Sequence, residues 1–319
     1  MSSRFSVLMP VYNRARHVSE AIDSLLSQVS ADDEVFVIDD GSTDETPQVL
    51  ESYGSRIQSI RQSNQGPEVA RNRAAGMAQG EYLVMLDSDD VLLPGALATY
   101  RRIIRAFDSP PLIFGAMTYF RDGQPPPASA KAPCPVEVLK YRDYLSKDIP
   151  IHMSNSRIVI RRSVFEEIGR YRNSSPATFL TDDFDLVLRA GIHGACILVQ
   201  KPYTVGYRQH GANGHLNARA VVDGILGMVR SERSGRYPGG KQRRSARYAF
   251  IGGLSASFAV RHCWRRGFHG EALRLLAGTA PMVLTATGDK FLRRLRKPTQ
   301  PIVLPAASTG TASSAASAA

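Results

Sequence analysis

The chain has 319 residues, of which 43% are hydrophobic and 22% are charged, as is typical of a globular protein with one large core. It has no run of about eighteen apolar residues, which excludes a membrane-spanning helix, and Pro10 and the charges after it interrupt the apolar start too early for a signal peptide. Three cysteines without metal-ligand spacing argue against a disulfide framework. We therefore expect a cytoplasmic protein.

The net charge of +11 is concentrated in the C-terminal part of the chain. Residues 201–319 hold 19 Lys and Arg against 4 Asp and Glu, whereas residues 1–200 hold 21 against 25. Such asymmetry indicates an anionic partner. Few aromatic residues interleave with the arginines and no nucleic-acid motif occurs, so we expect an anionic membrane surface, on the inner face of the membrane, and no nucleic acid. A merely solubilising basic surface is the alternative.

The first 90 residues alternate between expected strands and expected helices. Apolar runs and helical periodicity predict strands over 5–11, 34–40, 57–61 and 82–86, and helices over 18–29, from about 43 to 53, and 67–77. Ser42 or Thr43 would cap the second helix. This alternation predicts a doubly wound, mostly parallel α/β sheet flanked by helices. Ligands of such sheets bind beyond the carboxyl ends of the strands.

The remainder of the chain is less regular. Residues 108–135 are rich in Pro and Gly and predict an exposed loop, and residues 157–171 predict a strand followed by a short helix. From 216 the sequence is basic and helical, with two helices joined near Gly267. The Ala/Ser/Thr/Pro composition from Pro298 onward predicts a disordered tail.

Three acidic clusters are candidate sites. Asp87-Ser88-Asp89 follows a buried strand, and paired carboxylates suit Mg²⁺ or Mn²⁺, although such triplets also serve as helix caps. Asp90 would serve the loop or the following helix. Asp39-Asp40 follows another strand, where a carboxylate can accept a hydrogen bond from an imide N–H, or cap the next helix.

The third cluster is Asp182-Asp183, which precedes an expected helix. Acids in a first helical turn are favoured by the helix dipole in any case, but one of them could act as a general base. His210 follows in a Gly-rich loop and could contact a phosphate or a metal, although a lone His is more often structural.

Together these stretches resemble the family 2 glycosyltransferases, which have the GT-A fold. The resemblance spans about 210 residues and is carried, in the family's order, by 6–28, 35–46, 64–90, 181–191 ("TDDFDLVLRAG") and 207–214 ("YRQHGANG"). It implies a catalytic domain over 1–215, with nucleotide-sugar binding in 1–107 and the acceptor side in 108–215. A basic helical region over 216–297 and the tail 298–319 would follow.

The resemblance also implies roles for individual residues, with Asp182-Asp183 standing where the family frequently has Glu-Asp. Asp183 would be the catalytic base, and Asp89, with Asp87 and His210, would hold Mn²⁺ or Mg²⁺. Arg208 and His210 would close over the diphosphate, and Asp182 would support the same site. The expected nucleotide contacts are Pro10, Tyr12, Asn13, Asp39, Asp40, Arg71, Asp87 and Ser88.

The implied reaction is the inverting transfer of a sugar from a nucleotide-sugar donor, with UDP the expected nucleotide. The acceptor hydroxyl would belong to a surface polysaccharide, a glycolipid or a glycoprotein. Two alternatives stay open: a polyprenyl-phosphate sugar synthase, whose acceptor is a phosphate, and a sugar-nucleotide-binding subunit without turnover.

Overall fold

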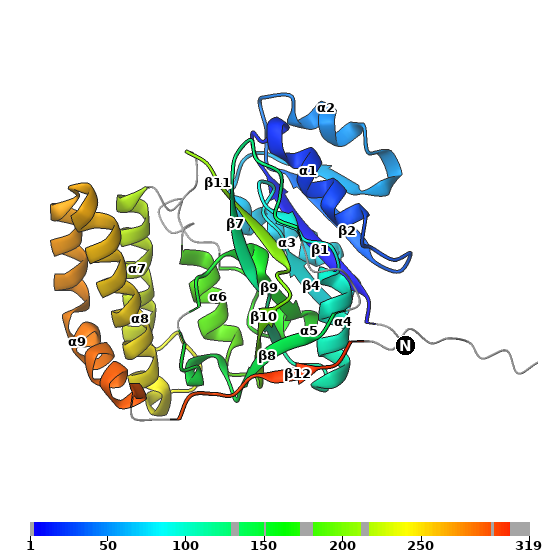
Figure 1. The fold of residues 1–319 in the computed structure, drawn as a ribbon. Coiled ribbons are helices and arrows are strands. Elements are labelled where there is room, and N and C mark those ends of the chain that lie inside the picture. Colours follow the sequence, from blue (N-terminus) through cyan, green and yellow to red (C-terminus); the bar gives the residue numbers. More distant parts are fainter. Residues whose placement is uncertain are drawn as a thin grey trace, which may run out of the picture.

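The computed structural model describes residues 3–128, 134–149, 151–172, 181–211, 217–294 and 297–306 (Figure 1). Its largest element is a nine-stranded sheet. In spatial order the strands are β12 (Ile302–Leu304), β8 (Val136–Tyr141), β10 (Cys196–Lys201), β6 (Leu112–Phe114), β9 (Ile158–Arg161), β4 (Tyr82–Met85), β1 (Phe5–Val11), β2 (Glu34–Asp39) and β3 (Gln58–Arg61).

The half of this sheet that is built from the first 90 residues is parallel. β1 pairs in parallel with β2 and β4, and β2 pairs in parallel with β3, so the carboxyl ends of these strands meet at one edge. Beyond β4 the sheet is mixed, because β9 runs antiparallel to both β4 and β6, and β8 to both β10 and β12. The predicted α/β class, a large sheet flanked by helices, is confirmed.

Strand residues alternate between the two faces of the sheet, and each face has its own apolar core. In β1, Phe5, Val7 and Met9 face one core while Leu8 faces the other. Helices α1 (Ala15–Leu26) and α4 (Ala96–Ala106) cover the first face, and α3 (Pro67–Met77) and α6 (Asp182–Ala190) cover the second. These strands are apolar without alternation because both faces are buried.

The segment expected as an exposed loop, 108–135, contains two strands, so that prediction is wrong for its first half. All three residues of β6 are buried in the main sheet. β7 (Met117–Arg121) joins a second sheet of three strands, in the order β5 (Val91–Leu92), β11 (Val205–Gln209), β7. This small sheet places Arg208 beside the loop that follows β4.

Three helices follow the mixed sheet: α7 (Ala218–Arg233), α8 (Arg244–Phe258) and α9 (His269–Arg294). They belong to the apolar core on the second face, where Phe250 of α8 contacts the rings of Tyr144 and Phe184 at centroid distances of 5.6 and 5.9 Å. Gly267, with φ +82°, ends the turn before α9, as expected. No helix in the described ranges is both long enough and apolar enough to cross a membrane.

The remaining helical segments are short. They are α2 (Thr46–Glu51), α5 (Arg162–Glu167), a π-helical turn (Ala259–Cys263) and 3₁₀ turns at Gly54–Arg56, Tyr144–Ser146, Asn155–Arg157, Lys241–Arg243 and Trp264–Arg266. Neither Ser42 nor Thr43 caps α2, because the helix starts three residues later and Asp44 accepts a hydrogen bond from the Thr46 N–H instead.

The predicted tail differs from expectation where the structure describes it. Residues 302–304 form β12 and pair antiparallel with β8 at the edge of the main sheet. Residues 307–319 lie outside the described residues. The proposed division at 215 and 297 stays a prediction.

Candidate active site

The first part of the site lies beyond the carboxyl ends of β1 and β2. Asn13, with φ +51°, turns the chain after β1, and its side-chain oxygen accepts a hydrogen bond from the Thr43 N–H at 2.8 Å. Ser42 in turn accepts one from the Asn13 N–H at 3.0 Å. Asp39 accepts a hydrogen bond from the Ser42 N–H at 2.9 Å. Thus Asn13 and Asp39, both predicted from the sequence, fix two neighbouring loops to each other.

Pro10 and Tyr12 flank the last residue of β1. Pro10 is buried within the strand, opposite Ile38 of β2, whereas the Tyr12 side chain is 44% exposed. An exposed aromatic ring at the end of a central strand is available to stack on a planar ligand.

Asp40 shapes the loop that leads into α3. Its carboxylate accepts hydrogen bonds from the Gln62 side chain at 2.8 Å, the Gln65 N–H at 3.0 Å and the Gly66 N–H at 2.7 Å. The residue is only 3% exposed. Asp40 therefore has a structural role that the sequence did not indicate, and its predicted contact with a base stays a prediction.

Arg71 of α3 joins two of the predicted acidic clusters. Its guanidinium, 3% exposed, pairs with the Asp87 carboxylate and, at 3.2 Å, with the Asp182 carboxylate. It also lies 5.4 Å from the centre of the Tyr171 ring. Burial favours the neutral form of Arg71, but the Asp87 carboxylate and the neighbouring acids raise its pKa above the ordinary value. The cation that links the two clusters is therefore permanent.

Asp182 and Asp183 begin α6 on the second face of the sheet. Burial, with the Asp87 charge adding to it and Arg71 opposing it, raises the pKa of Asp182 to about 6. Burial and the Asp182 charge raise the pKa of Asp183 well above its ordinary value, although its carboxylate accepts a hydrogen bond from the Phe184 N–H at 2.7 Å. A carboxylate with a raised pKa is a stronger base than a solvated one.

Asp89 has basic partners of its own. It lies 3.3 Å from the Arg14 guanidinium and 2.9 Å from Nε2 of His210. Burial alone would raise its pKa, but the hydrogen bond to His210 and the charge of Arg14 hold the pKa of Asp89 below the ordinary value. Ser88 is buried between Asp87 and Asp89.

Asp90 and Arg208 fix the loop after β4 to the small sheet. The Asp90 carboxylate accepts hydrogen bonds from the Ser156 hydroxyl at 2.6 Å and from the Arg208 N–H at 2.9 Å. The Arg208 guanidinium donates to the Asp89 carbonyl at 2.9 Å and pairs with Glu20. Asp90 thus serves the loop, one of the two roles predicted for it.

The structure adds residues to the site that the sequence reasoning missed. The ring of His17, on α1, stacks on that of His210 with centroids 5.4 Å apart, and its Nε2 lies 3.0 Å from Asp122. His17 follows Asn13 by four residues, but no spacing rule connects it to residues 122 and 210. Only the fold brings these three together.

Glu68, one turn before Arg71 on α3, was also missed. It is 1% exposed, and neither of its carboxyl oxygens has a hydrogen-bond partner in the described part of the chain. Burial, with the charge of Asp182 next, raises the pKa of Glu68 to about 8. Pro67 and Glu68 are typical of an ordinary first helical turn, so nothing in the sequence indicates that Glu68 belongs to the site.

The acidic loop can be tested for its fit to a divalent cation. Within the described ranges no group of three or more His, Cys, Asp or Glu side chains is arranged to hold a metal ion. Asp87 and Asp89 are two carboxylates of one loop, a donor set that suits a Mg²⁺ or Mn²⁺ bound mainly through substrate phosphates and water. The residues therefore fit a cation that arrives with a phosphorylated ligand, not a preformed protein cage.

The parallel half of the sheet carries acidic loops at its strand ends and is faced by a pair of buried aspartates, and the fold is that of the GT-A class. Residues 6–169, just over half of the chain, match the model of glycosyl transferase family 2. An uncharacterized glycosyltransferase of Nostoc sp. is 30% identical over 229 residues, 69% of each chain. The chain belongs to glycosyl transferase family 2.

Other relatives match over shorter stretches. The glycosyltransferase GlyG of Streptococcus pneumoniae is 28% identical over 37% of this chain and 41% of its own. The chondroitin synthase of Escherichia coli is 38% identical over 29% of this chain and 14% of its own. The chain thus spans well under two thirds of these two relatives.

Solved structures share the fold at low sequence identity. The structure of S. aureus TarS 1-349 in complex with UDP-GlcNAc has a TM-score of 0.61 and 17% identity, over 91% of this chain and 81% of that one. The structure of TarS itself has a TM-score of 0.59 and 19% identity, with 49% of that chain covered. The predicted family and fold are both confirmed.

Proposed function

We propose that this protein is an inverting, metal-dependent glycosyltransferase that moves a sugar from a UDP-sugar to an acceptor hydroxyl. The observation that carries the proposal is the Arg71 bridge, in which one buried guanidinium joins Asp87 of the acidic loop to Asp182, the neighbour of the proposed base. A donor held at the acidic loop would then lie beside Asp183. The UDP-GlcNAc in the TarS structure, which has the same fold, supports the choice of donor.

In this mechanism Asp183 accepts the proton of the acceptor hydroxyl while that oxygen attacks the anomeric carbon from the face opposite the diphosphate. The new glycosidic bond forms as the bond to the diphosphate breaks, which inverts the configuration and releases UDP. Arg71 holds Asp182 and Asp87 in place, and Tyr12, Asn13, Asp39 and Asp40 form the base-binding end of the donor site. No covalent enzyme intermediate is needed.

Asp87 and Asp89, with His210 at the edge, would hold Mg²⁺ or Mn²⁺ together with the diphosphate. When bound, such a cation offsets the charge that develops on the leaving group. Arg208 already holds the backbone of this loop through the Asp89 carbonyl. Its role is to keep the loop closed against the donor.

The acceptor in this proposal is a surface polysaccharide, a glycolipid or a glycoprotein. The basic C-terminal helices would bring the enzyme to an anionic membrane on the cytoplasmic side, where such acceptors are made. Their cores pack on the catalytic sheet. Their exposed residues are therefore the part available to a membrane.

The test uses Asp89→Ala and Asp183→Asn, with Asp32→Asn, an exposed aspartate before β2, as control. UDP release from a panel of UDP-sugars with Mn²⁺ or Mg²⁺ is measured. Each site variant should lower transfer by roughly a hundredfold or more, the scale of losing a general base or a charge-stabilising group. Only Asp89→Ala should sharply weaken Mn²⁺-dependent binding of UDP.

The raised pKa of Asp183 gives the pH dependence its direction. The base must be ionised, so transfer by the wild-type protein should increase with pH until Asp183 has lost its proton. Full activity of Asp183→Asn would show that the base is assigned wrongly. The same result would favour a phosphate acceptor, which needs little deprotonation. Absence of UDP release from every donor would favour a binding subunit.

A further inference from the structure

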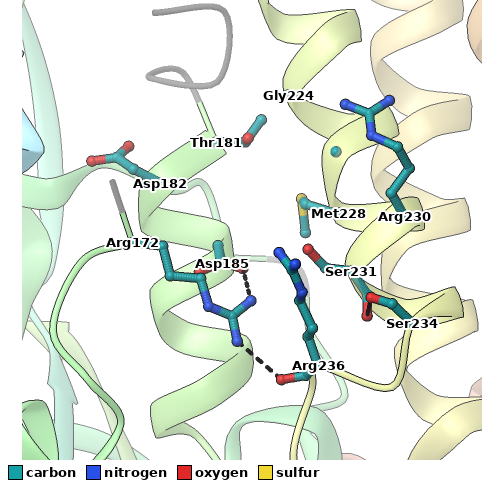
Figure 2. Close-up of a pocket in the computed structure, with 11 residues that line it drawn as sticks. Arg172, Thr181, Asp182, Asp185, Gly224, Met228, Arg230, Ser231, Ser234 and Arg236 are labelled. Atoms are coloured by element: carbon teal, nitrogen blue, oxygen red, sulfur yellow. Dashed lines mark hydrogen bonds and ion pairs between the residues drawn. The ribbon is translucent and has the colours of Figure 1, made fainter. Parts of the chain in front are cut away.

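A cavity of about 460 Å³ lies between α6 and α7 (Figure 2). Thr181 and Asp182 from the start of α6 form one side, and Met228, Arg230 and Ser231 of α7 form the other, with the turn after α7 below. The volume is within the range of small-molecule sites. Asp182 belongs both to this cavity and to the site described above, and the other lining residues were given no role there.

The two helices approach each other closely at Gly224 and Thr181, which both line the cavity. A Cβ atom on Gly224 of α7 would lie 2.5 Å from the Thr181 hydroxyl oxygen, so only glycine permits this approach. Asp182 lines the cavity and Asp183 follows it in the same helical turn. The cavity therefore borders the residue that precedes the proposed base in the chain.

The two acids that line the cavity, Asp182 and Asp185, already pair with arginines. Asp182 pairs with Arg71, and Asp185 pairs with Arg172 at 3.2 Å and with Arg189 at 2.8 Å. Arg172 also donates to the backbone carbonyl of Arg236 at 2.9 Å, as Figure 2 shows. These contacts fix the walls and neutralise their acidic charge.

Two further lining arginines add positive charge without such partners. Arg230 and Arg236 are exposed, and within the described ranges neither guanidinium has an ion pair or a side-chain hydrogen bond. The hydroxyls of Ser231 and Ser234 lie on the same side, between these two arginines in the sequence. Met228 is the apolar side chain among the described lining residues, and none of these residues is aromatic.

We propose that this cavity binds a phosphate group of the acceptor, with Arg230 and Arg236 as its ligands. Guanidinium groups match the oxygens of a phosphate in pairs, and the Ser231 hydroxyl can donate to a remaining oxygen, whereas the Ser234 hydroxyl donates to the Ser231 carbonyl at 3.1 Å. The proposal rests on the proposed function, since the same acceptor offers its hydroxyl to Asp183. The phosphate is a binding group here and does not attack the sugar.

The test measures binding of three small probes to the full chain by calorimetric titration, with UDP and Mn²⁺ at saturation so that the donor site is filled. Glycerol 3-phosphate carries a phosphate, glycerate a carboxylate and glycerol neither. The double variant Arg230→Gln/Arg236→Gln is compared with Arg233→Gln, an exposed arginine of α7 that does not line the cavity. Circular dichroism verifies that each variant is folded.

We expect glycerol 3-phosphate to bind and glycerol not to bind, with glycerate weaker than the phosphate. The double variant should weaken glycerol 3-phosphate binding by about tenfold or more, and Arg233→Gln by less than about twofold. Equal binding by the double variant and the control, or no binding of the phosphate probe once UDP fills its site, would overturn the proposal. Failure to bind UDP at all would instead overturn the proposed function. In that case glycerol 3-phosphate is titrated without UDP, and the same variants decide whether the cavity binds it.

Discussion

Glu68 is a carboxyl group whose surroundings oppose its charge. The unfolded chain loses the proton of this residue near pH 4.5, whereas the folded protein retains it up to about pH 8. Between these values the folded state binds more protons than the unfolded state, so the free energy of unfolding falls as pH rises. The expected slope from this one group is at most about 1.4 kcal/mol per pH unit.

Glu68→Gln removes this proton and should flatten the dependence, leaving the variant similar to wild type at pH 5 and more stable at pH 8. Urea unfolding at pH 5, 6, 7 and 8 measures the effect. Glu51→Gln, at the exposed end of α2, is the matched control and should leave the wild-type slope unchanged. Asp182 and Asp183, whose pKa values are also raised, contribute a slope of the same sign in both proteins. A slope in Glu68→Gln equal to that of wild type would therefore show that Glu68 is already ionised at neutral pH.

Residues at strand ends were predictable, and those that meet only through the fold were not. Asp39 and Asp87 could be placed from the sequence because each directly follows a run of buried apolar residues, and Asp89 lies two positions after Asp87. The Arg71–Asp182 pair joins positions 111 apart in the chain, so no local pattern reports it. Likewise no local pattern reports the partners of Asp40, because they lie in the 62–66 loop, more than 20 positions further along the chain.

At the scale of elements, helices α8 and α9 cross with their backbones in contact. A Cβ atom on Gly252 would lie 1.9 Å from the backbone oxygen of Met282, so a side chain here would force the two helices apart. Gly252→Ala should therefore lower the free energy of unfolding by about 1–3 kcal/mol, the usual range for overpacking a buried contact. Chemical denaturation measures this change.

Gly253→Ala is the control because the next residue faces outward. Its nearest neighbour would be the Ala286 Cβ at 3.9 Å, which is ordinary contact. Alanine at an exposed helical position is favoured over glycine by up to about 1 kcal/mol, so this variant should be neutral or more stable. Equal effects of the two variants on the free energy of unfolding would show that the Gly252–Met282 contact does not set the outcome.

Two of the elements missed from the sequence, β6 and β12, are short strands that depend on distant partners. β6 has three residues, and it is a strand because β9 and β10 lie on either side of it. β12 has three residues within a low-complexity segment, and it is held by β8, more than 150 positions earlier. Composition predicts the average state of a segment, whereas these strands are fixed by hydrogen bonds from remote parts of the chain.

At the scale of the molecule, the basic charge and the exposed apolar side chains occur in the same region. Trp264 is 52% exposed and Phe268 45%, and Arg265 and Arg266 lie between them in the sequence. This turn joins α8 to α9, at the end of the helical layer away from β12 in Figure 1. Aromatic residues beside arginines are the combination that binds the interface of an anionic bilayer.

The protein should therefore bind vesicles that contain phosphatidylglycerol at low salt and should release them at high salt, as measured by flotation. Neutral phosphatidylcholine vesicles should not bind it, because the attraction is electrostatic and is screened within about 10 Å at 0.1 M salt. Arg265→Gln/Arg266→Gln and Trp264→Ser should each weaken binding. Arg105→Gln/Arg121→Gln, which removes the same charge from exposed positions in the catalytic part, should have a smaller effect. Binding that ignores ionic strength, or equal loss in both double variants, would show that the turn at 264–268 is not the membrane contact.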